Sequence, residues 1–279
     1  MPAAKKKPAA RKAPAKKVAA KKVAAKKPAA KKTAVKKVAS KKPARKAIDW
    51  TTKTALVTGA NRGIGLEVAR QLGQAGCRVI LAARDAALGE EAAQPLRAEG
   101  LDVRVEKLDV SDEQSVKDCA ARLRQAGIAV DILVNNAGIY DRTPVLTLPT
   151  ETFMNVFRTN TLGALWCSQA FIPGMIERQW GRVVMVSSGL GTFSRGMLGH
   201  PCYAISKAAL NALTVKLAQA APDSVKINAV RPGWVKTRLA GDLGKDSVET
   251  GAGRVAYLAL LPDDGPTGGY FRGQRSSRW

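Results

Sequence analysis

Short apolar segments alternate with longer helix-type segments along the chain from residue 54 onward. The short segments are rich in β-branched residues or alternate in polarity, and they lie at 54–58, 78–83, 102–107, 131–134, 181–186, 225–231 and 269–272. Such lengths are typical of strands buried in a sheet. Segments with helical character lie between them, at 66–75, 112–125, after Pro149, at 208–221 and at 248–261.

This alternation of strand and helix predicts an α/β fold. Regular βα repetition produces a parallel, doubly wound sheet of the Rossmann type, with ligands at the carboxyl ends of the strands. We expect about seven strands. The 279 residues are enough for one large domain of this kind. We therefore expect a single Rossmann-fold domain at 49–279, preceded by a disordered basic tail at 1–48.

The charge of the chain is concentrated in the tail. Residues 1–48 contain 17 Lys and 2 Arg and no acid, whereas all 22 acidic residues lie in the remainder. Basic pairs recur every five residues, so they would wind around a helix rather than form one stripe, and five prolines interrupt the segment. No apolar face is present, so we expect disorder.

A disordered polycation suits the phosphate backbone of nucleic acid. We expect binding that is non-specific and steeply dependent on salt, because it depends on counterion release. A charge run that only aids solubility, an anionic membrane surface and polyphosphate are the alternatives. A mitochondrial transit peptide is less favoured, because such peptides are amphipathic and rich in Arg and Ser.

A glycine-rich turn follows the first strand. The run Thr58-Gly59-Ala60-Asn61-Arg62-Gly63-Ile64-Gly65 leads into a helix, which is the arrangement that binds a pyrophosphate at a helix N-terminus. Its spacing differs from the general G-x-G-x-x-G fingerprint.

The residues after the second strand favour NADP over NAD. Arg84 stands where an NAD enzyme would place an acid, and Arg62 lies in the glycine turn. Two guanidinium groups would suit a ribose 2′-phosphate. Asp85 follows directly and keeps NAD open as an alternative.

Tyr203 and Lys207 are four residues apart at the start of a helical segment, so they share one face. An ammonium group beside a phenol stabilises the phenolate and is expected to lower its pKa. Such pairs are common on helix surfaces, so the context decides. That context includes Ser187 and Ser188 after the fifth strand and Asn160 in mid-helix, where asparagine is unfavourable.

The remaining composition excludes several other classes. The four scattered cysteines indicate reduced thiols, and with one histidine in the chain we expect no metal site. No apolar run approaches the roughly 20 residues of a membrane span, and the N-terminus lacks the apolar region of a secretory signal. We expect a cytoplasmic protein without membrane contact, associated with a nucleoid or chromatin through its tail.

Taken in order, these motifs resemble the short-chain dehydrogenase/reductase family over about residues 51–279. The shared features are T-G-A-N-R-G-I-G, N-N-A-G at 135–138, Asn160, Ser188, Y-x-x-x-K at 203–207 and P-G-W-V-K-T at 232–237. The run V-S-S-G-L-G and the ending G-G-Y-F-R are similar to the carbonyl-reductase branch, which prefers NADPH. The tail is similar to the Lys/Ala/Pro tails of linker histones and has no counterpart in the family.

The resemblance implies a role for each site residue. Tyr203 would be the general acid, Lys207 would lower its pKa and hold the nicotinamide ribose, Ser188 would bind the substrate carbonyl, and Asn160 would hold a water. The family pattern favours Ser188 over Ser187. The expected cofactor-binding residues are Gly59, Asn61, Arg62, Gly63, Ile64, Gly65, Arg84, Asp109, Val110, Asn136, Ala137, Gly138, Tyr203, Lys207, Pro232, Val235 and Thr237.

Two functions are therefore consistent with the sequence. The first is an NADPH-dependent reductase of a ketone or aldehyde, tethered to nucleic acid by its tail. The alternative is a nucleic-acid-associated protein that uses the reductase fold to sense the NADP redox state. Only fourteen residues separate Ser188 from Tyr203, so the helices of Asn160 and Tyr203 are free to pair with another subunit, and we expect a homodimer or homotetramer. Residues 236–250 are expected to form a mobile lid.

Overall fold

The computed structural model describes residues 47–238 and 244–279. The predicted disordered tail therefore lies outside the described residues, apart from its last two positions, and the predicted lid lies partly outside them. The residues Ala47–Trp279 form one unit, which is built around a single sheet.

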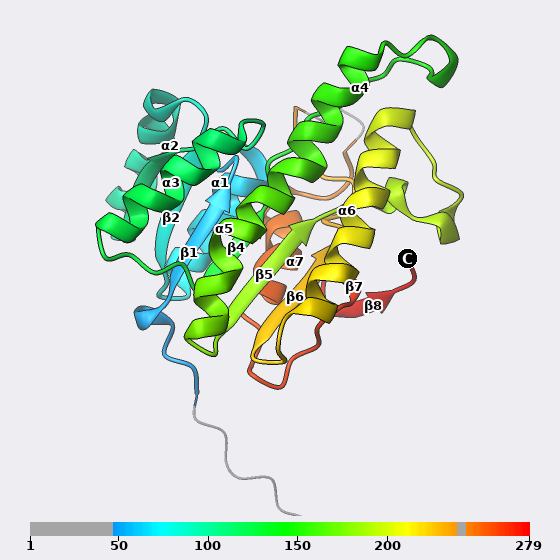
Figure 1. Cartoon of the computed structure of the whole chain (residues 1–279). Helices are drawn as coiled ribbons and strands as arrows, with labels where there is room; N and C mark the ends of the chain where they lie inside the picture. Colours follow the sequence, from blue (N-terminus) through cyan, green and yellow to red (C-terminus); the bar gives the residue numbers. More distant parts are fainter. Residues whose placement is uncertain (1–46, 239–243) are drawn as a thin grey trace, which may run out of the picture. The chain divides into compact units, whose positions relative to one another are not determined.

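The sheet has eight strands in the order β3-β2-β1-β4-β5-β6-β7-β8 (Figure 1). Their bounds are β1 Thr54–Thr58, β2 Arg78–Ala83, β3 Val103–Lys107, β4 Ile132–Asn135, β5 Gly181–Val186, β6 Val225–Val230, β7 Tyr270–Arg272 and β8 Arg275–Ser277. The first seven are parallel, and β8 pairs antiparallel with β7. The predicted Rossmann-type sheet is confirmed, with one strand more than expected.

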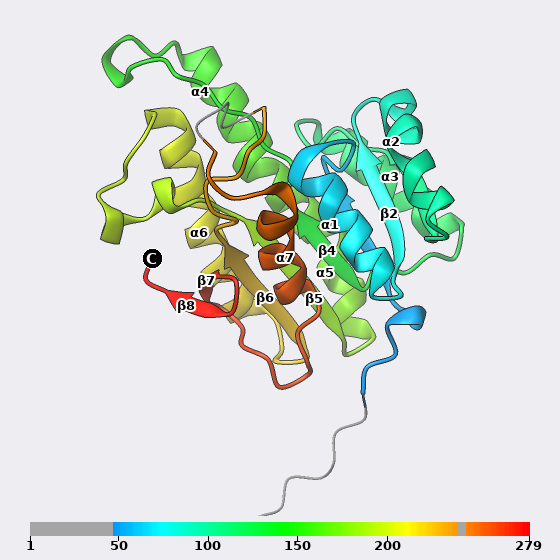
Figure 2. The same ribbon diagram turned by 180° about the vertical axis from the view of Figure 1, so that it is seen from behind.

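The described residues form seven α-helices, and the two views show helices on both faces of the sheet (Figures 1 and 2). They are α1 Gly63–Gln74, α2 Ala86–Ala98, α3 Glu113–Gln125, α4 Thr150–Phe157, α5 Gly163–Glu177, α6 Pro201–Ala220 and α7 Val248–Ala259. Helices α1, α2 and α7 bury their apolar side chains in one core, and α3, α5 and α6 bury theirs in the other. Both faces of the sheet are thus covered, which explains the almost continuously apolar strands.

Five short turns complete the described elements. Four are 3-10 turns, η1 Trp50–Thr52, η2 Val145–Thr147, η4 Gly189–Gly191 and η5 Phe193–Arg195. The fifth, η3 Arg158–Leu162, is a π-helical turn that joins α4 to α5.

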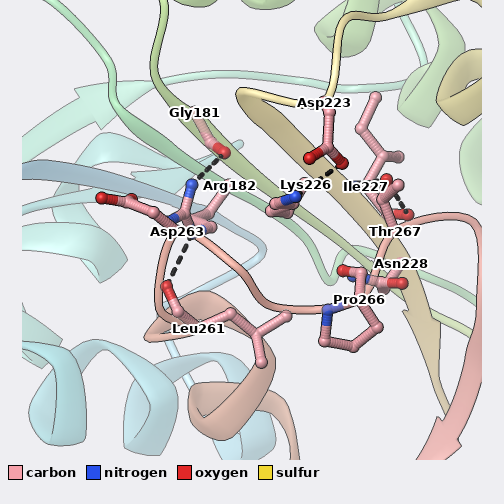
Figure 3. Close-up of polar contacts among 10 residues, drawn as sticks. All are labelled: Gly181, Arg182, Asp223, Lys226, Ile227, Asn228, Leu261, Asp263, Pro266 and Thr267. Carbon is pink, nitrogen blue, oxygen red and sulfur yellow. Dashed lines mark hydrogen bonds and ion pairs between the residues drawn. The ribbon is translucent and has the colours of Figure 1, made fainter. Parts of the chain in front are cut away.

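Two buried cations fix the amino ends of β5 and β6. Arg182 and Lys226 are direct neighbours across the two strands and are almost fully buried. Arg182 pairs with Asp263 at 2.8 Å, and Lys226 pairs with Asp223 at 2.6 Å (Figure 3). Two like charges at one buried position would repel, so each carries its own acid. These contacts lie at the edge of the sheet opposite the candidate site.

Candidate active site

The turn after β5 packs directly on α6, and this brings Ser188 to Tyr203. A Cβ at Gly191 would lie 2.7 Å from the Ala208 nitrogen, so only glycine allows this approach. Helix α6 begins with Pro201 at its first position, where proline is favourable. Its first two turns therefore present Tyr203 and Lys207 beside the end of β5.

Tyr203 and Lys207 are both buried on this face of α6, at 8% and 4% exposure. Lys207 Nζ lies 5.7 Å from the centre of the Tyr203 ring and donates a hydrogen bond to the Val186 carbonyl oxygen at 2.9 Å. Helix α6 thus holds the phenol and the ammonium side by side at the carboxyl end of β5.

Burial governs the pKa of both groups. It raises the pKa of Tyr203 to about 12, although a hydrogen bond with Ser188 acts in the opposite direction. Burial also lowers the pKa of Lys207 to about 8. Desolvation is therefore the main cause of the raised pKa of Tyr203, and the expected lowering of this pKa by Lys207 stays a prediction.

The two adjacent serines have different surroundings. Ser187 is buried, and its hydroxyl donates to Asn211 Oδ1 on α6 at 2.5 Å. Ser188 is partly exposed, accepts from the Leu190 amide at 3.2 Å and hydrogen-bonds Tyr203. Ser188 is thus the serine that faces Tyr203, in agreement with the family pattern.

Asn160 lies in the π-helical turn η3, a distortion that often marks functional sites. Its Oδ1 accepts from the Ile139 amide at 2.8 Å, and its Nδ2 donates to the Ile139 carbonyl oxygen and to Ser206 Oγ, each at 3.0 Å. A Cβ on Gly138 would lie 3.3 Å from Asn160 Oδ1 and 3.5 Å from Lys207 Nζ. Asn160, Gly138 and Lys207 therefore meet, and Ser206 is a positioning residue that the sequence did not reveal.

Tyr140 is a second residue that the sequence analysis missed. Its ring lies 4.8 Å from that of Tyr203 and 5.4 Å from that of His200. Burial raises the pKa of Tyr140. The Tyr140 ring thus packs against both Tyr203 and His200. Its sequence signal was an aromatic residue shortly after N-N-A-G.

The glycine turn before α1 has the backbone shape that an anion site requires. Gly59 and Gly63 have φ values of +62° and +56°, which favour glycine. A Cβ on Gly65 would lie 2.5 Å from both Asn136 Nδ2 and the Gly59 carbonyl oxygen. The first turn of α1 is thereby held against the end of β4, with its free amide groups at the carboxyl edge of the sheet.

Thr58 and Asn136 lock this turn in place. The Thr58 hydroxyl accepts from the amides of Asn136 and Ala137 at 3.0 Å, and Asn136 Nδ2 donates to the Thr58 carbonyl oxygen at 2.9 Å. Thr58 was not among the expected site residues. Asn61 is half-buried in the turn, and Ile64 packs on the core.

The residues expected at the adenosine end have distinct surroundings. The guanidinium groups of Arg62 and Arg84 are exposed and form no hydrogen bond or ion pair within 47–238 and 244–279. Asp85 Oδ1 caps α2 by accepting from the Ala87 and Leu88 amides at 2.9 and 3.2 Å. Asp85 is thus engaged in the helix cap, which disfavours the NAD alternative.

Arg84 also lines an open cavity of about 530 Å³ together with Asp109. Asp109 Oδ1 accepts from the Ser111 amide, and buried Val110 packs under Gly163 at the start of α5. Of the two expected adenine contacts, Asp109 therefore shares this cavity with Arg84, whereas Val110 packs against α5.

The segment after β6 reaches back to the glycine turn. A Cβ on Gly63 would lie 3.7 Å from Thr237 Cγ2, so Thr237 closes over the start of α1. Val235 is buried against Gly251 of α7, and the Pro232 carbonyl oxygen accepts from Arg254. The Val235 side chain is therefore packed against α7, and its carbonyl oxygen accepts from the Thr237 hydroxyl at 3.4 Å.

These residues fit an extended dinucleotide. The carboxyl edge of the sheet carries a turn with positive φ and the free Arg62 at a helix N-terminus, a second free arginine, Arg84, after β2, and a buried lysine on the helix after β5. Such groups would suit a pyrophosphate, a 2′-phosphate and a nicotinamide ribose. Within the described part of the chain, no group of three His, Cys, Asp or Glu could hold a metal ion.

The sequence model of the short chain dehydrogenases matches residues 53–248 of the chain. The chain belongs to the short-chain dehydrogenase family. Its relatives include the 3-oxoacyl-[acyl-carrier-protein] reductase of Pseudomonas aeruginosa, which is 34% identical over 75% of this chain and 82% of that protein. Carbonyl reductase [NADPH] 1 of Homo sapiens is 34% identical over 81% of this chain and 98% of that protein. The predicted family is confirmed, and carbonyl reductases are among its relatives.

Solved structures of this family agree with the fold. An NADPH-bound carbonyl reductase from chicken fatty liver has a TM-score of 0.72 and 28% identity, covering 81% of this chain and 99% of that one. A gluconate 5-dehydrogenase from Burkholderia cenocepacia, in complex with NADP and tartrate, has the same TM-score and 26% identity, over 81% of this chain and 95% of that one.

The four cysteines are buried free thiols. Burial raises the pKa of Cys77 and Cys119 to about 11, so they are protonated and unreactive at neutral pH. In the described ranges, no helix has the length and apolar character needed to cross a membrane.

Proposed function

We propose that this protein is an NADP(H)-dependent oxidoreductase that reduces the carbonyl group of a ketone or aldehyde to an alcohol. The observation that carries the proposal is the meeting of Ser188, Tyr203 and Lys207 at the end of β5, with Asn160 behind Lys207. The NADPH-binding relatives and the NADP-bound structural neighbour support the cofactor, as do the free guanidinium groups of Arg62 and Arg84.

NADPH, when bound, supplies the hydride that reduces the carbonyl carbon. Tyr203 transfers its hydroxyl proton to the carbonyl oxygen, and Ser188 donates a hydrogen bond to the same oxygen while negative charge develops there. Lys207 holds the nicotinamide ribose. Arg62 and Arg84 hold the 2′-phosphate, and the amides of the glycine turn hold the pyrophosphate.

The raised pKa of Tyr203 is compatible with its proposed role as proton donor in carbonyl reduction. A pKa near 12 keeps the phenol protonated at neutral pH. Reduction needs that protonated donor, whereas oxidation of an alcohol needs the phenolate.

The test is NADPH consumption by the purified full-length protein across ketones and aldehydes that differ in size and charge. At least one substrate should be converted to its alcohol with one NADPH consumed per carbonyl group. Complete inertness of a folded, NADPH-binding protein across the panel would contradict the proposal.

We further propose that the basic tail binds nucleic acid without sequence preference. Its 17 Lys and 2 Arg without an acid support an electrostatic mode. DNA binding by the full-length chain should weaken steeply with salt and vanish for a chain that begins at Ala47, while turnover is retained. Binding that survives removal of the tail would refute this role. A change of DNA affinity between NADP⁺ and NADPH would favour the redox-sensor alternative.

A homo-oligomer is the third part of the proposal. Met154 on α4 and Ile205 on α6 expose 41% and 39% of their surface on two helices that contact each other. A second copy would cover them. Light scattering of the full-length protein should give twice or four times the chain mass, and Ile205→Asp should reduce it; a monomer would contradict the proposal.

A further inference from the structure

A second cavity lies beside the candidate site and shares none of its four catalytic residues. It has a volume of about 260 Å³ and lies between η5, the end of β6 and the β7–β8 hairpin. Its lining consists of Ser194, Arg195, Arg231, Tyr270, Ser277 and Arg278. All six side chains can donate a hydrogen bond, and none of them is an acid.

The charges around this cavity are unbalanced. Arg195, Arg231 and Arg278 contribute three cations to one small space. Burial lowers the pKa of Arg231, Tyr270 acts in the opposite direction, and the neighbouring Arg195, Arg272 and Arg254 lower it further. Of these neighbours, Arg254 is neutralised by Asp246 at 2.7 Å. The cavity therefore concentrates positive charge that described acids do not offset.

Two buried polar groups in the lining have no partner. Tyr270 is 1% exposed, and its hydroxyl forms no hydrogen bond with any described residue; the same holds for Arg231 Nε. Leaving such buried groups unpaired is energetically unfavourable. A hydroxyl and a guanidinium N–H that line one cavity would both be satisfied by the oxygens of a single ligand.

We propose that this cavity binds a small oxyanion, either a carboxylate or a phosphate group, with the guanidinium groups as its main partners. Guanidinium groups bind both anions through paired hydrogen bonds, and the serine and tyrosine hydroxyls complete the donor set. The anion is either free in solution or part of a carbonyl substrate.

Two arginines of the cavity lie close to Gly189, the residue after Ser188. An anionic group on the carbonyl substrate is therefore within the scope of the proposal. A Cβ on Gly189 would lie 3.3 Å from Arg195 Nε and 3.4 Å from Arg231 Nη1. Gly189 directly follows Ser188, and Ser194 and Arg195 belong to the loop between Ser188 and Tyr203. The cavity thus borders the turn that presents Ser188.

The test uses phenylglyoxal, which modifies arginine, on full-length protein saturated with NADP so that Arg62 and Arg84 are occupied. The rate at each arginine is followed by peptide mapping, with and without inorganic phosphate at constant ionic strength. Phosphate should slow modification of Arg195 and Arg278 by at least about threefold, as expected for a well-occupied site. Arg124, which is exposed on α3, should be unaffected.

Two variants test whether phosphate protects these arginines by binding in the cavity. Arg195→Gln should abolish protection of Arg278, and Tyr270→Phe should weaken it at both arginines, with folding checked by circular dichroism. The proposal is refuted if phosphate protects neither arginine in the wild type, if it protects Arg124 equally, or if both variants keep full protection. This readout does not depend on turnover, so its failure would leave the proposed reductase activity untouched.

A pair of substrates distinguishes the two sources of the anion. Arg195→Gln should raise KM for a keto acid by about tenfold, but not for its methyl ester, if the anion belongs to the substrate. Unchanged KM values together with lost phosphate protection would identify a free anion. Both results support the site, and this second experiment rests on the proposed reductase activity.

Discussion

The side-chain amide of Asn160 forms two hydrogen bonds with the backbone of Ile139. Oδ1 accepts from the Ile139 nitrogen at 2.8 Å, and Nδ2 donates to the Ile139 carbonyl oxygen at 3.0 Å. Nδ2 also donates to Ser206 Oγ on α6 at 3.0 Å. One buried amide therefore joins three segments: the exit from β4, the π-helical turn and the helix that carries Tyr203 and Lys207.

Replacing Asn160 with leucine should destabilise this junction. The Asn160→Leu variant keeps a similar volume but leaves the Ile139 amide and carbonyl unpaired, so we expect the free energy of unfolding to fall by about 2–4 kcal/mol. Urea unfolding measures the loss. Asn155→Leu, at an exposed position of α4, should change it by less than about 0.5 kcal/mol. Equal losses in the two variants would show that the hydrogen bonds between Asn160 and Ile139 contribute nothing to the free energy of unfolding.

The sequence predicted the sheet more accurately than the site geometry. The bounds expected for the strands at 54–58, 78–83 and 181–186 agree with β1, β2 and β5, because buried parallel strands are short and almost continuously apolar. Helix α1 begins at Gly63, three residues before the expected start, because its first turn is part of the glycine motif. Helix α2 and strand β8 were missed, since both are largely exposed and have weak patterns.

Local spacing could not reveal the environment of the site residues. The spacing between Tyr203 and Lys207 predicts that they share a face, but the pKa of Tyr203 depends on burial under Tyr140 and the turn at Ser188, which are distant in sequence. The π-helical turn at Asn160 likewise follows from contacts with Ile139 and Ser206. These are tertiary effects.

Lys207 should make the stability of the fold depend on pH. Burial lowers its pKa from 10.5 to about 8, so between these values the unfolded chain holds a proton that the folded chain has lost. Stability therefore rises with pH across this window. From pH 7.5 to 9.5, we expect this effect to contribute about 2 kcal/mol.

The Lys207→Met variant isolates this contribution. The raised pKa values of Cys77, Cys119 and Tyr203 act in the opposite direction above pH 9, but they are common to both proteins. Urea unfolding at pH 7.5 and 9.5 should show the wild type gaining about 2 kcal/mol relative to Lys207→Met. If the stability of the wild type and of Lys207→Met changes equally with pH, the pKa of Lys207 is not lowered in the folded protein.

Gly65→Ala should disrupt the turn before α1. The new methyl group would lie 2.5 Å from the Gly59 carbonyl oxygen, which cannot move without opening the turn. We expect a loss of about 2 kcal/mol or more in stability and at least about tenfold weaker NADPH binding, measured by fluorescence titration. Gly253→Ala in α7 has room for its methyl group and should be neutral or slightly stabilising. If Gly65→Ala binds NADPH normally, the turn does not form the cofactor cradle.

Arg84 should discriminate NADPH from NADH. Its exposed guanidinium has no described partner, and its charge is expected to serve a 2′-phosphate. Arg84→Ala should weaken NADPH binding by about ten- to a hundredfold and leave NADH binding within about twofold, as for the loss of one charge-assisted contact. Arg124→Ala should change neither affinity. A parallel loss of both cofactors would assign Arg84 to general binding rather than to the 2′-phosphate.

The most direct test of the central claim is single-turnover hydride transfer with Tyr203→Phe and, as a matched control, Tyr140→Phe. Both substitutions keep the packed rings and remove one hydroxyl. We predict that Tyr203→Phe binds NADPH normally and reduces its carbonyl substrate about 10²–10⁴ times more slowly, because no proton donor remains, while Tyr140→Phe stays close to the wild type. Unchanged hydride transfer in Tyr203→Phe would contradict the assignment of Tyr203 as the proton donor.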